Sequence, residues 1–518
     1  MTKKILILLP ALLLFSLSAG SGIASDNAPE QNVPGQLSPA EKREKALALF
    51  ISALLEKDPG ARCSQLLDVA AADPGNAETP LAVFASSFSK VRDWRKLLEK
   101  FNKLLAQHPL NPHIVSHGAE LNRTCGTPAQ ERLRQLKTAL FVSAPLPWGK
   151  RQLAILLNRG AEALLELGDF KGLLALTLNR GNELPGAAIL AGPCHTAAAR
   201  CYAAGNDDLG KKLEGCFDRC VERLRTLEKT VTGEIDAGAI LTFYTVYRAV
   251  LDKDAMRFMT ALYARRPGER TNLLCLTTAV ECGDVAVFDR AAAEVVRLRP
   301  RFDPSELRFK TLLNGGKFAE AEAELKRLPE KRHFDLRRLM LLKKRDWKAL
   351  TGLVSAYLAG GGAPDPEVGL LLLTASEHLQ DRALYRKACA LLKKHLNLPA
   401  VANAVGYVGA TMGLDLEQGR QLIDFALSKE PDSAAYLDSM AWVAFKQNRF
   451  ADAEKWITRA LEHAVPREGV SVILEHAGDI AAALKKDPAR FYGLALKYAP
   501  FDEEFDRETV SKKMKKVR

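Results

Sequence analysis

The chain has 518 residues, of which 47% are hydrophobic and only 7% aromatic, and its formal net charge is +12. This length argues against a single compact core, because cores stop growing at about 250–300 residues and longer chains divide into domains or extend as repeats. The abundance of Ala and Leu favours helices that pack closely through small side chains, and no segment alternates convincingly with a strand period of two. An all-α protein is therefore expected.

The N-terminus has the layout of a secretory signal. Lys3 and Lys4 precede an apolar run over residues 5–15, which is followed by small residues. The run is short for a membrane span of ~20 residues and is interrupted by Pro10. We expect cleavage that removes residues 1–24 and an exported chain, periplasmic or secreted; an uncleaved membrane anchor is the alternative.

Clusters of Gly, Pro and Asp divide the rest of the chain into runs of predicted helices, with strong breaks at 144–147, 184–193 and 360–364. The expected parts are a signal peptide (1–24), a flexible leader (25–39), degenerate helical repeats (40–235), more regular repeats (236–366), C-terminal repeats (367–499) and a basic terminal helix or tail (500–518).

Three Ala-Leu pairs recur near the C-terminus at an almost fixed stride. They are Ala426-Leu427, Ala460-Leu461 and Ala495-Leu496, and the steps are 460 − 426 = 34 and 495 − 460 = 35 residues. A period near 34 is that of a helix hairpin, which cannot bury its apolar face alone and stacks on its neighbours. The stride predicts an α-solenoid of stacked antiparallel helix hairpins.

The segment 435–461 resembles a tetratricopeptide repeat (TPR). The resemblance rests on small Ala441 where two helices touch, aromatic Phe450 after the turn, and small Ala453 and Ala460 in the second helix. Segments 402–431 and 473–500 resemble it too, and the three together are similar to the terminal repeats of exported bacterial TPR proteins.

Upstream the same pattern is weaker. Residues 316–321 keep the turn and its small residues, and residues 283–285 form a similar turn one unit earlier. In three other units, Leu97, Leu173 and Leu350 replace the expected alanine. The resemblance therefore implies degenerate, irregular TPR-like repeats from about residue 40 to 366.

In TPR proteins the first helix of each hairpin lines a concave groove, and one register position recurs as a column along it. The resemblance places Asn403, Asp438 and Glu475 in one column, Tyr407, Trp442 and Asp479 in the next, and Phe445 and Lys446 beside them. Such a groove implies binding of an extended or helical peptide. Alternatively, Asn403, Asp438, His476 and Asp479 only bond neighbouring helices and turns. Trp456, on a second helix, is expected to pack.

The sequence lacks the motifs of common enzymes: no His-Glu-x-x-His helix, Gly-x-Ser-x-Gly elbow or phosphate-binding loop is present. The Ser-x-x-Lys match at residues 87–90 lacks its companion motifs. We therefore expect a non-catalytic scaffold that binds a protein or peptide of the cell envelope, without cofactor, metal or nucleic acid. A helical enzyme of cell-wall metabolism is the least favoured alternative.

The last seven residues are strongly basic, with Lys512, Lys513, Lys515, Lys516 and Arg518. A terminal helix that caps the solenoid with a polar face is one interpretation. The other is contact with an anionic envelope polymer or membrane surface, which would make the chain an adaptor.

Four of the nine cysteines fall in one predicted hairpin, formed by helices over 193–204 and 209–228. Folding it about residues 205–208 places Cys194 opposite Cys220 and Cys201 near Cys216. Two nested disulfides, buried free thiols or a four-sulfur zinc site are the alternatives.

Overall fold

The computed structural model describes residues 39–517, apart from 143–145, 147, 183, 228–239, 241–257, 259–268, 467 and 502–504. The predicted signal peptide and nearly all of the predicted leader lie outside the described residues. The described elements are α-helices and short 3-10 helices, with no strand among them, so the predicted all-α class is confirmed. No helix in the described part of the chain is both long and apolar enough to cross a membrane.

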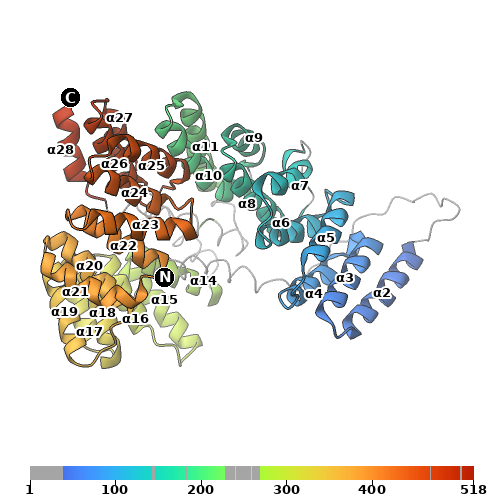
Figure 1. The fold of residues 1–518 in the computed structure, drawn as a ribbon. Coiled ribbons are helices and arrows are strands. Elements are labelled where there is room, and N and C mark those ends of the chain that lie inside the picture. Colours follow the sequence, from blue (N-terminus) through green and yellow to red (C-terminus); the bar gives the residue numbers. More distant parts are fainter. Residues whose placement is uncertain are drawn as a thin grey trace. The chain divides into compact units, whose positions relative to one another are not determined.

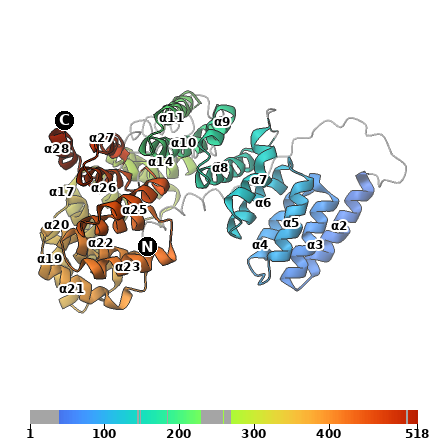
Figure 2. The same ribbon diagram turned by 45° about the horizontal axis from the view of Figure 1, so that its top comes forward.

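The chain forms two compact units. Unit one comprises residues 1–197 and 212–239, and unit two comprises 198–211 and 240–518. The helices of unit one are α2 (Pro39–Leu55), α3 (Pro59–Ala72), α4 (Glu78–Phe88), α5 (Arg95–Gln107), α6 (Pro112–Thr124), α7 (Ala129–Phe141), α8 (Lys150–Glu166), α9 (Phe170–Arg180), and most of α10 (Gly186–Ala203) and α11 (Asp207–Leu227). Many consecutive helices pack against each other, among them α2 and α3, α3 and α4, and α7 and α8, as Figures 1 and 2 show for α2 and α3.

Unit two is a longer series of hairpins that ends in a single helix (Figure 1). Its helices are α14 (Glu269–Cys282), α15 (Val285–Leu298), α16 (Ser305–Asn314), α17 (Phe318–Leu325), α18 (His333–Lys344), α19 (Trp347–Ala359), α20 (Pro366–Leu379), α21 (Arg382–Leu392), α22 (Pro399–Thr411), α23 (Leu416–Lys429), α24 (Ala434–Lys446), α25 (Phe450–His463), α26 (Val470–Ala483), α27 (Ala489–Tyr498) and α28 (Arg507–Val517). The predicted α-solenoid of stacked hairpins is confirmed.

The same tight turn joins the two helices of many hairpins. The first helix ends, one residue takes a left-handed conformation, a second residue caps the next helix, and that helix begins. Gly168, Gly283, Arg345, Gln380 and Asn448 are five such left-handed residues. In each case the N–H that follows bonds a carbonyl five residues back, which satisfies an otherwise unpaired group at the helix end. The turns predicted at residues 283–285 and 316–321 are therefore present.

Small residues let the two helices of a hairpin approach closely. A Cβ added at Gly406 of α22 would lie 2.7 Å from the carbonyl oxygen of Gly419 in α23, so the two backbones touch. In the last hairpin, Gly478 has the ring of Tyr492 against it, and its added Cβ would lie 2.3 Å away. Ala441, at the equivalent position in α24, is fully buried. The predicted small residues at helix contacts thus mark the core of each hairpin.

The first helices of neighbouring hairpins contact one another directly: α20 packs on α22, α22 on α24, and α24 on α26. The second helices, α21, α23, α25 and α27, make no comparable contacts among themselves. We call the surface formed by α20, α22, α24 and α26 the first-helix face. Side chains from hairpins about 35 residues apart in sequence can meet there.

The hairpin formed by α10 and α11 differs from the sequence prediction. Helix α10 begins at Gly186, seven residues before the predicted start at Pro193, so this proline lies inside the helix. The residues before it include Ala187, Leu190 and Ala191, all fully buried, and burying them offsets the backbone hydrogen bond that proline cannot donate.

Candidate functional site

The predicted site residues all lie on α22, α24 and α26, the first helices of the last three hairpins. They are Asn403 and Tyr407 on α22, Asp438, Trp442, Phe445 and Lys446 on α24, and Glu475 and Asp479 on α26. The first-helix face therefore brings the two predicted columns onto adjoining helices. Their side chains are only partly exposed, and Asp438 is buried.

Asp438 is bound by the next hairpin. Its two carboxylate oxygens lie 2.9 and 3.1 Å from Nδ1 of His476, and both side chains are buried. The bond joins α24 to α26 across 38 residues of sequence. Asp438 thus fits the alternative interpretation, in which it bonds a neighbouring helix, and its carboxylate is already occupied.

Carboxylates near His476 favour the protonated form of its imidazole. Burial opposes a charge on the imidazole, but the carboxylate of Asp438 and, more weakly, two acidic side chains of α26 outweigh it, so the pKa of His476 is raised. Burial, assisted by Glu377 and Asp438, also raises the pKa of Tyr407. Glu377 lies on α20, one hairpin earlier, and burial raises the pKa of its carboxyl group. Four successive first helices therefore contribute polar groups to one cluster.

Trp442 is held in place by its neighbours. Its Nε1 donates a hydrogen bond to Thr411 Oγ1 at 3.1 Å, and its ring stacks on His476 with centroids 4.1 Å apart. Phe445 stacks against it at 5.0 Å, and Nζ of Lys446 lies 4.7 Å from its centroid. The predicted aromatic lining is present, but much of the indole surface is already covered within the protein.

Glu475 and Asp479 are paired with the C-terminal helix. Nζ of Lys513 on α28 lies 2.7 Å from Glu475 and 2.6 Å from Asp479, and the hydroxyl of Tyr492 donates to Asp479 at 2.8 Å. Sequence reasoning assigned Lys513 to a basic outer surface, whereas the structure directs it toward the first-helix face. Helical periodicity could have shown that Lys513 lies on the same face of α28 as buried Val510, three residues earlier.

Asn403 differs from the other predicted residues. Its Oδ1 is shielded from solvent and has no hydrogen-bond partner among the described residues. A shielded acceptor without a partner costs free energy, which a ligand N–H or a water molecule would recover. Asn403 is therefore the member of the predicted columns best suited to contact a guest.

Two residues that the sequence analysis missed complete the cluster: Glu377 and Thr411. Both lie near the C-terminal ends of first helices, and an extension of the repeat register into 367–379 would have pointed to Glu377. Across the described part of the chain, no group of three or more His, Cys, Asp or Glu side chains could hold a metal ion.

Comparison with known proteins supports the type of repeat. No family model matches the chain. A TPR repeat-containing protein of Pseudomonas aeruginosa is 35% identical over 77 residues, which cover 15% of this chain and 12% of that protein. Over these residues the chain is similar to a TPR protein, which agrees with the resemblance predicted from the sequence. Because the match covers so little of the relative's length, it transfers the type of repeat and not the relative's activity.

Solved structures of other helical repeat proteins align over most of the chain at low similarity. They include the APC/C hetero-tetramer Cut9-Hcn1 (12% identity, TM-score 0.33, 92% of this chain and 97% of that one) and yeast Tom70 (12%, 0.32, 92% and 96%). The pentatricopeptide repeat protein PPR10 from maize aligns with 13% identity and a TM-score of 0.36, over 93% of this chain and 74% of that one. The assignment of the fold therefore rests on the TPR-type hairpins of the structure itself and not on these weak similarities.

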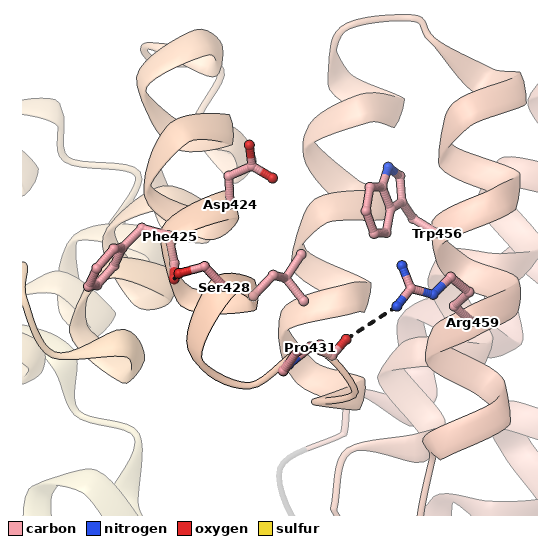
Figure 3. Close-up of a pocket in the computed structure, with 7 residues that line it drawn as sticks. Asp424, Phe425, Ser428, Pro431, Trp456 and Arg459 are labelled. Atoms are coloured by element: carbon pink, nitrogen blue, oxygen red, sulfur yellow. Dashed lines mark hydrogen bonds between the residues drawn. The ribbon is translucent and has the colours of Figure 1, made fainter.

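The second helices of the TPR units carry a shallow hollow. It lies between α23 and α25 and has a volume of 520 Å³ (Figure 3). Trp456 and Arg459 line one side, with the guanidinium 5.1 Å from the indole centroid, while Phe425 and Ser428 line the other. Arg459 also donates to the carbonyl of Pro431 at 3.3 Å. Trp456 packs against the hydrophobic core with part of its ring and borders the hollow with the rest.

Helix α28 packs on the last TPR hairpin, with Val510 fully buried and Met514 against the same core. Deleting residues 505–517 is therefore expected to lower the free energy of unfolding of the C-terminal repeats by about 2–3 kcal/mol. Hydrogen exchange should show lost protection in α26 and α27. Lys516→Ala, at an exposed position of α28, is the control and should leave protection unchanged. Full protection after the deletion would show that α28 does not stabilise these helices.

Proposed function

We propose that this protein is a non-catalytic scaffold of the bacterial cell envelope that holds a segment of another protein on its first-helix face. One observation supports the proposal: polar and aromatic side chains from four successive first helices meet on one face, and Asn403 has an acceptor oxygen there with no partner in the described part of the chain. Repeat arrays present such continuous surfaces for extended guests. The proposal assigns no covalent chemistry to the chain.

The internal bonds of this face suit it to binding a guest. The Asp438–His476 bond, the Trp442–Thr411 bond and the contacts of Lys513 hold the side chains in fixed positions before any guest arrives. A preorganised surface spends less conformational entropy on binding. Asn403 and Lys446 flank this fixed cluster on neighbouring helices, and we propose that they make the direct contacts.

The proposed location rests on the N-terminal sequence. Lys3 and Lys4, the apolar run over 5–15 and the small residues that follow form a secretory signal in our interpretation. N-terminal sequencing of the protein recovered from a periplasmic fraction tests this, with residue 25 expected as the first. Recovery of the chain only from the cytoplasm would remove the envelope from the proposal.

The binding site is tested by cross-linking from defined positions. A photoreactive amino acid at position 446, on the first-helix face, is expected to cross-link one protein in envelope extract. The same probe at 455, on the exposed side of α25, serves as the control and should give no such product. The captured protein is then identified by mass spectrometry and purified for binding measurements.

With that protein in hand, Asn403→Ala is expected to weaken binding about tenfold, the effect of losing one hydrogen bond in a shielded site. Lys455→Ala should bind like the unmodified protein. Equal affinity of the Asn403→Ala variant, or equal cross-linking from positions 446 and 455, would place the binding site elsewhere on the molecule.

The alternative adaptor role depends on basic residues of the C-terminal helix. Lys515 and Lys516 are exposed on α28, whereas Lys512 pairs with Glu508 and Lys513 with α26. Fewer basic groups thus remain for an anionic polymer or membrane surface than the sequence implies. Binding through them should weaken steeply between low and physiological salt, whereas binding on the first-helix face should persist.

A further inference from the structure

Three cysteine side chains gather inside unit one, between α9, α10 and α11. Cys194 lies on α10, and Cys216 and Cys220 lie one turn apart on α11. All three are buried, with exposed fractions of 0%, 1% and 2%. They are free thiols in the structure, like the other six cysteines. Neither the proposed binding face nor its contacts use this cluster.

The register of the α10–α11 hairpin determines which thiols meet. The ring of His195 stacks on that of Phe217, with centroids 4.7 Å apart, and the ring of Tyr202 packs against Gly210. Each of these pairs is centred on residue 206, so the position opposite Cys194 is residue 218, midway between Cys216 and Cys220. Of these two thiols, Cys216 forms the hydrogen bond with Cys194.

This register corrects the predicted proximity of Cys201 and Cys216. Cys201 lies closer to the turn than Cys194 and therefore faces the beginning of α11, not Cys216. Burial raises the pKa of Cys201, and no other thiol contributes to that shift. The four sulfurs thus do not converge as a zinc site or as two nested bridges would require.

The environments of Cys194 and Cys216 differ in a way that separates their roles. Nη2 of Arg219 donates to Sγ of Cys216 at 3.0 Å, and the thiol of Cys194 donates to the same sulfur. These two donors favour a thiolate at Cys216 and lower its pKa below that of an ordinary thiol, chiefly through Cys194. The pKa of Cys194 is raised, chiefly by the same bond and then by burial, and its sulfur lies 3.1 Å from the hydroxyl of Thr177.

We infer that Cys194 and Cys216 are a reactive dithiol that closes to an intrachain disulfide between α10 and α11 by exchange with a disulfide oxidant, while Cys220 stays reduced. The Cys216 thiolate attacks one sulfur of the oxidant and releases the first thiol. Cys194 then loses its proton to solvent and attacks Sγ of Cys216, which releases the second thiol. Two protein thiols and one disulfide thus become one protein disulfide and two thiols.

Two further features support this assignment. Arg219, which covers the sulfur of Cys216, is itself exposed, so movement of one flexible side chain opens a route to the thiolate. Cys220 instead packs against α9: a Cβ added at Gly181 would lie 3.3 Å from its sulfur. Burial, followed by the charge of Cys216, raises the pKa of Cys220, so it is a weaker nucleophile and competes poorly.

The pairing is tested on the full chain with oxidised glutathione as the oxidant. The native protein should lose about 2 Da, and peptide mapping without reduction should link Cys194 to Cys216. Cys220→Ser should form the same bond. Cys194→Ser should stop at a glutathione adduct on Cys216, and Cys216→Ser should form neither product. A Cys194–Cys220 link, a Cys201–Cys216 link, or nine thiols remaining at equilibrium would overturn the inference.

The role of Arg219 is tested by reaction rate, which a merely buried pair would not alter. At pH 6, Arg219→Ala is expected to slow modification of Cys216 by iodoacetamide on the order of fivefold, because fewer molecules carry the thiolate. The matched control is Arg223→Ala, one turn further along α11, where the guanidinium bonds the carbonyl of Asn182 and not a cysteine. Equal rates in Arg219→Ala and the native protein across pH 5–9 would show that Cys216 is an ordinary buried thiol.

Discussion

Asp438→Ala is expected to lower the free energy of unfolding by about 3 kcal/mol at pH 6. The substitution leaves the buried Nδ1 of His476 without its acceptor, so the imidazole either keeps an uncompensated charge or gives up its proton. Urea unfolding of the full chain, followed by helical circular dichroism, measures the loss. Asp452→Ala, which removes a pair with exposed Arg449 on α25, is the control and should shift the urea midpoint little.

The dependence of the unfolding free energy on pH provides a second test of the Asp438–His476 bond. The folded-state pKa of His476 is raised above its unfolded value of about 6.5, so folding favours the protonated imidazole. The resulting stabilisation is fully present below the unfolded pKa and is lost as pH rises through the folded pKa. Between about pH 5 and 9, the stability difference between the native protein and His476→Gln should therefore shrink as pH rises. A difference that grows with pH would contradict a charged His476.

Gly406→Ala is expected to destabilise the protein by about 2–3 kcal/mol, although alanine favours helix by about 1 kcal/mol over glycine. The added Cβ would lie 2.7 Å from the carbonyl oxygen of Gly419 and 2.9 Å from Ile423, so α22 and α23 must move apart. The loss should appear as a lower urea midpoint and as earlier hydrogen exchange in both helices.

Gly352→Ala provides the matched control for this contact. Gly352 also lies inside a helix, α19, but a Cβ added there meets no atom within 4 Å. Alanine should therefore stabilise the protein by up to about 1 kcal/mol through helix propensity alone. If both substitutions stabilise to the same degree, α22 and α23 do not touch as described.

Much of the fold was predictable because it follows from local signals. The alanines of the three Ala-Leu pairs, Ala426, Ala460 and Ala495, are fully buried, as a fixed stride of hairpins requires. The turn signals at residues 283 and 316 also fell between helices, after α14 and after α16. The predictions that were wrong depended on burial, which one segment of sequence does not reveal. Pro193 predicted the start of a helix, but the apolar residues before it belong to α10 as well. Which thiols of the α10–α11 hairpin meet likewise depends on side-chain contacts that the position of the turn does not determine.

The sequence predicted which helices carry the candidate site residues, but not which side chains those residues contact. The repeat register placed Asn403, Asp438 and Glu475 on first helices, since that depends only on helical periodicity. Which side chain meets which depends on the rotation between hairpins and on α28, which interrupts the repeat. His476 therefore pairs with the carboxylate of Asp438, an internal role that the sequence analysis offered as an alternative. Lys513 pairs with Glu475, for which the sequence analysis predicted only contact with a guest.

The uneven contacts between hairpins give the C-terminal array an uneven stiffness. The first helices pack directly on one another, and the Asp438–His476 bond joins two of them. The second helices α23 and α25 are instead separated by the hollow beside Trp456. A change in curvature can widen or narrow that hollow with little loss of contact, whereas the same displacement on the opposite side would break a dense interface. We therefore expect the C-terminal array to bend with a constant spacing between its first helices, while the spacing between the second helices α23 and α25 changes.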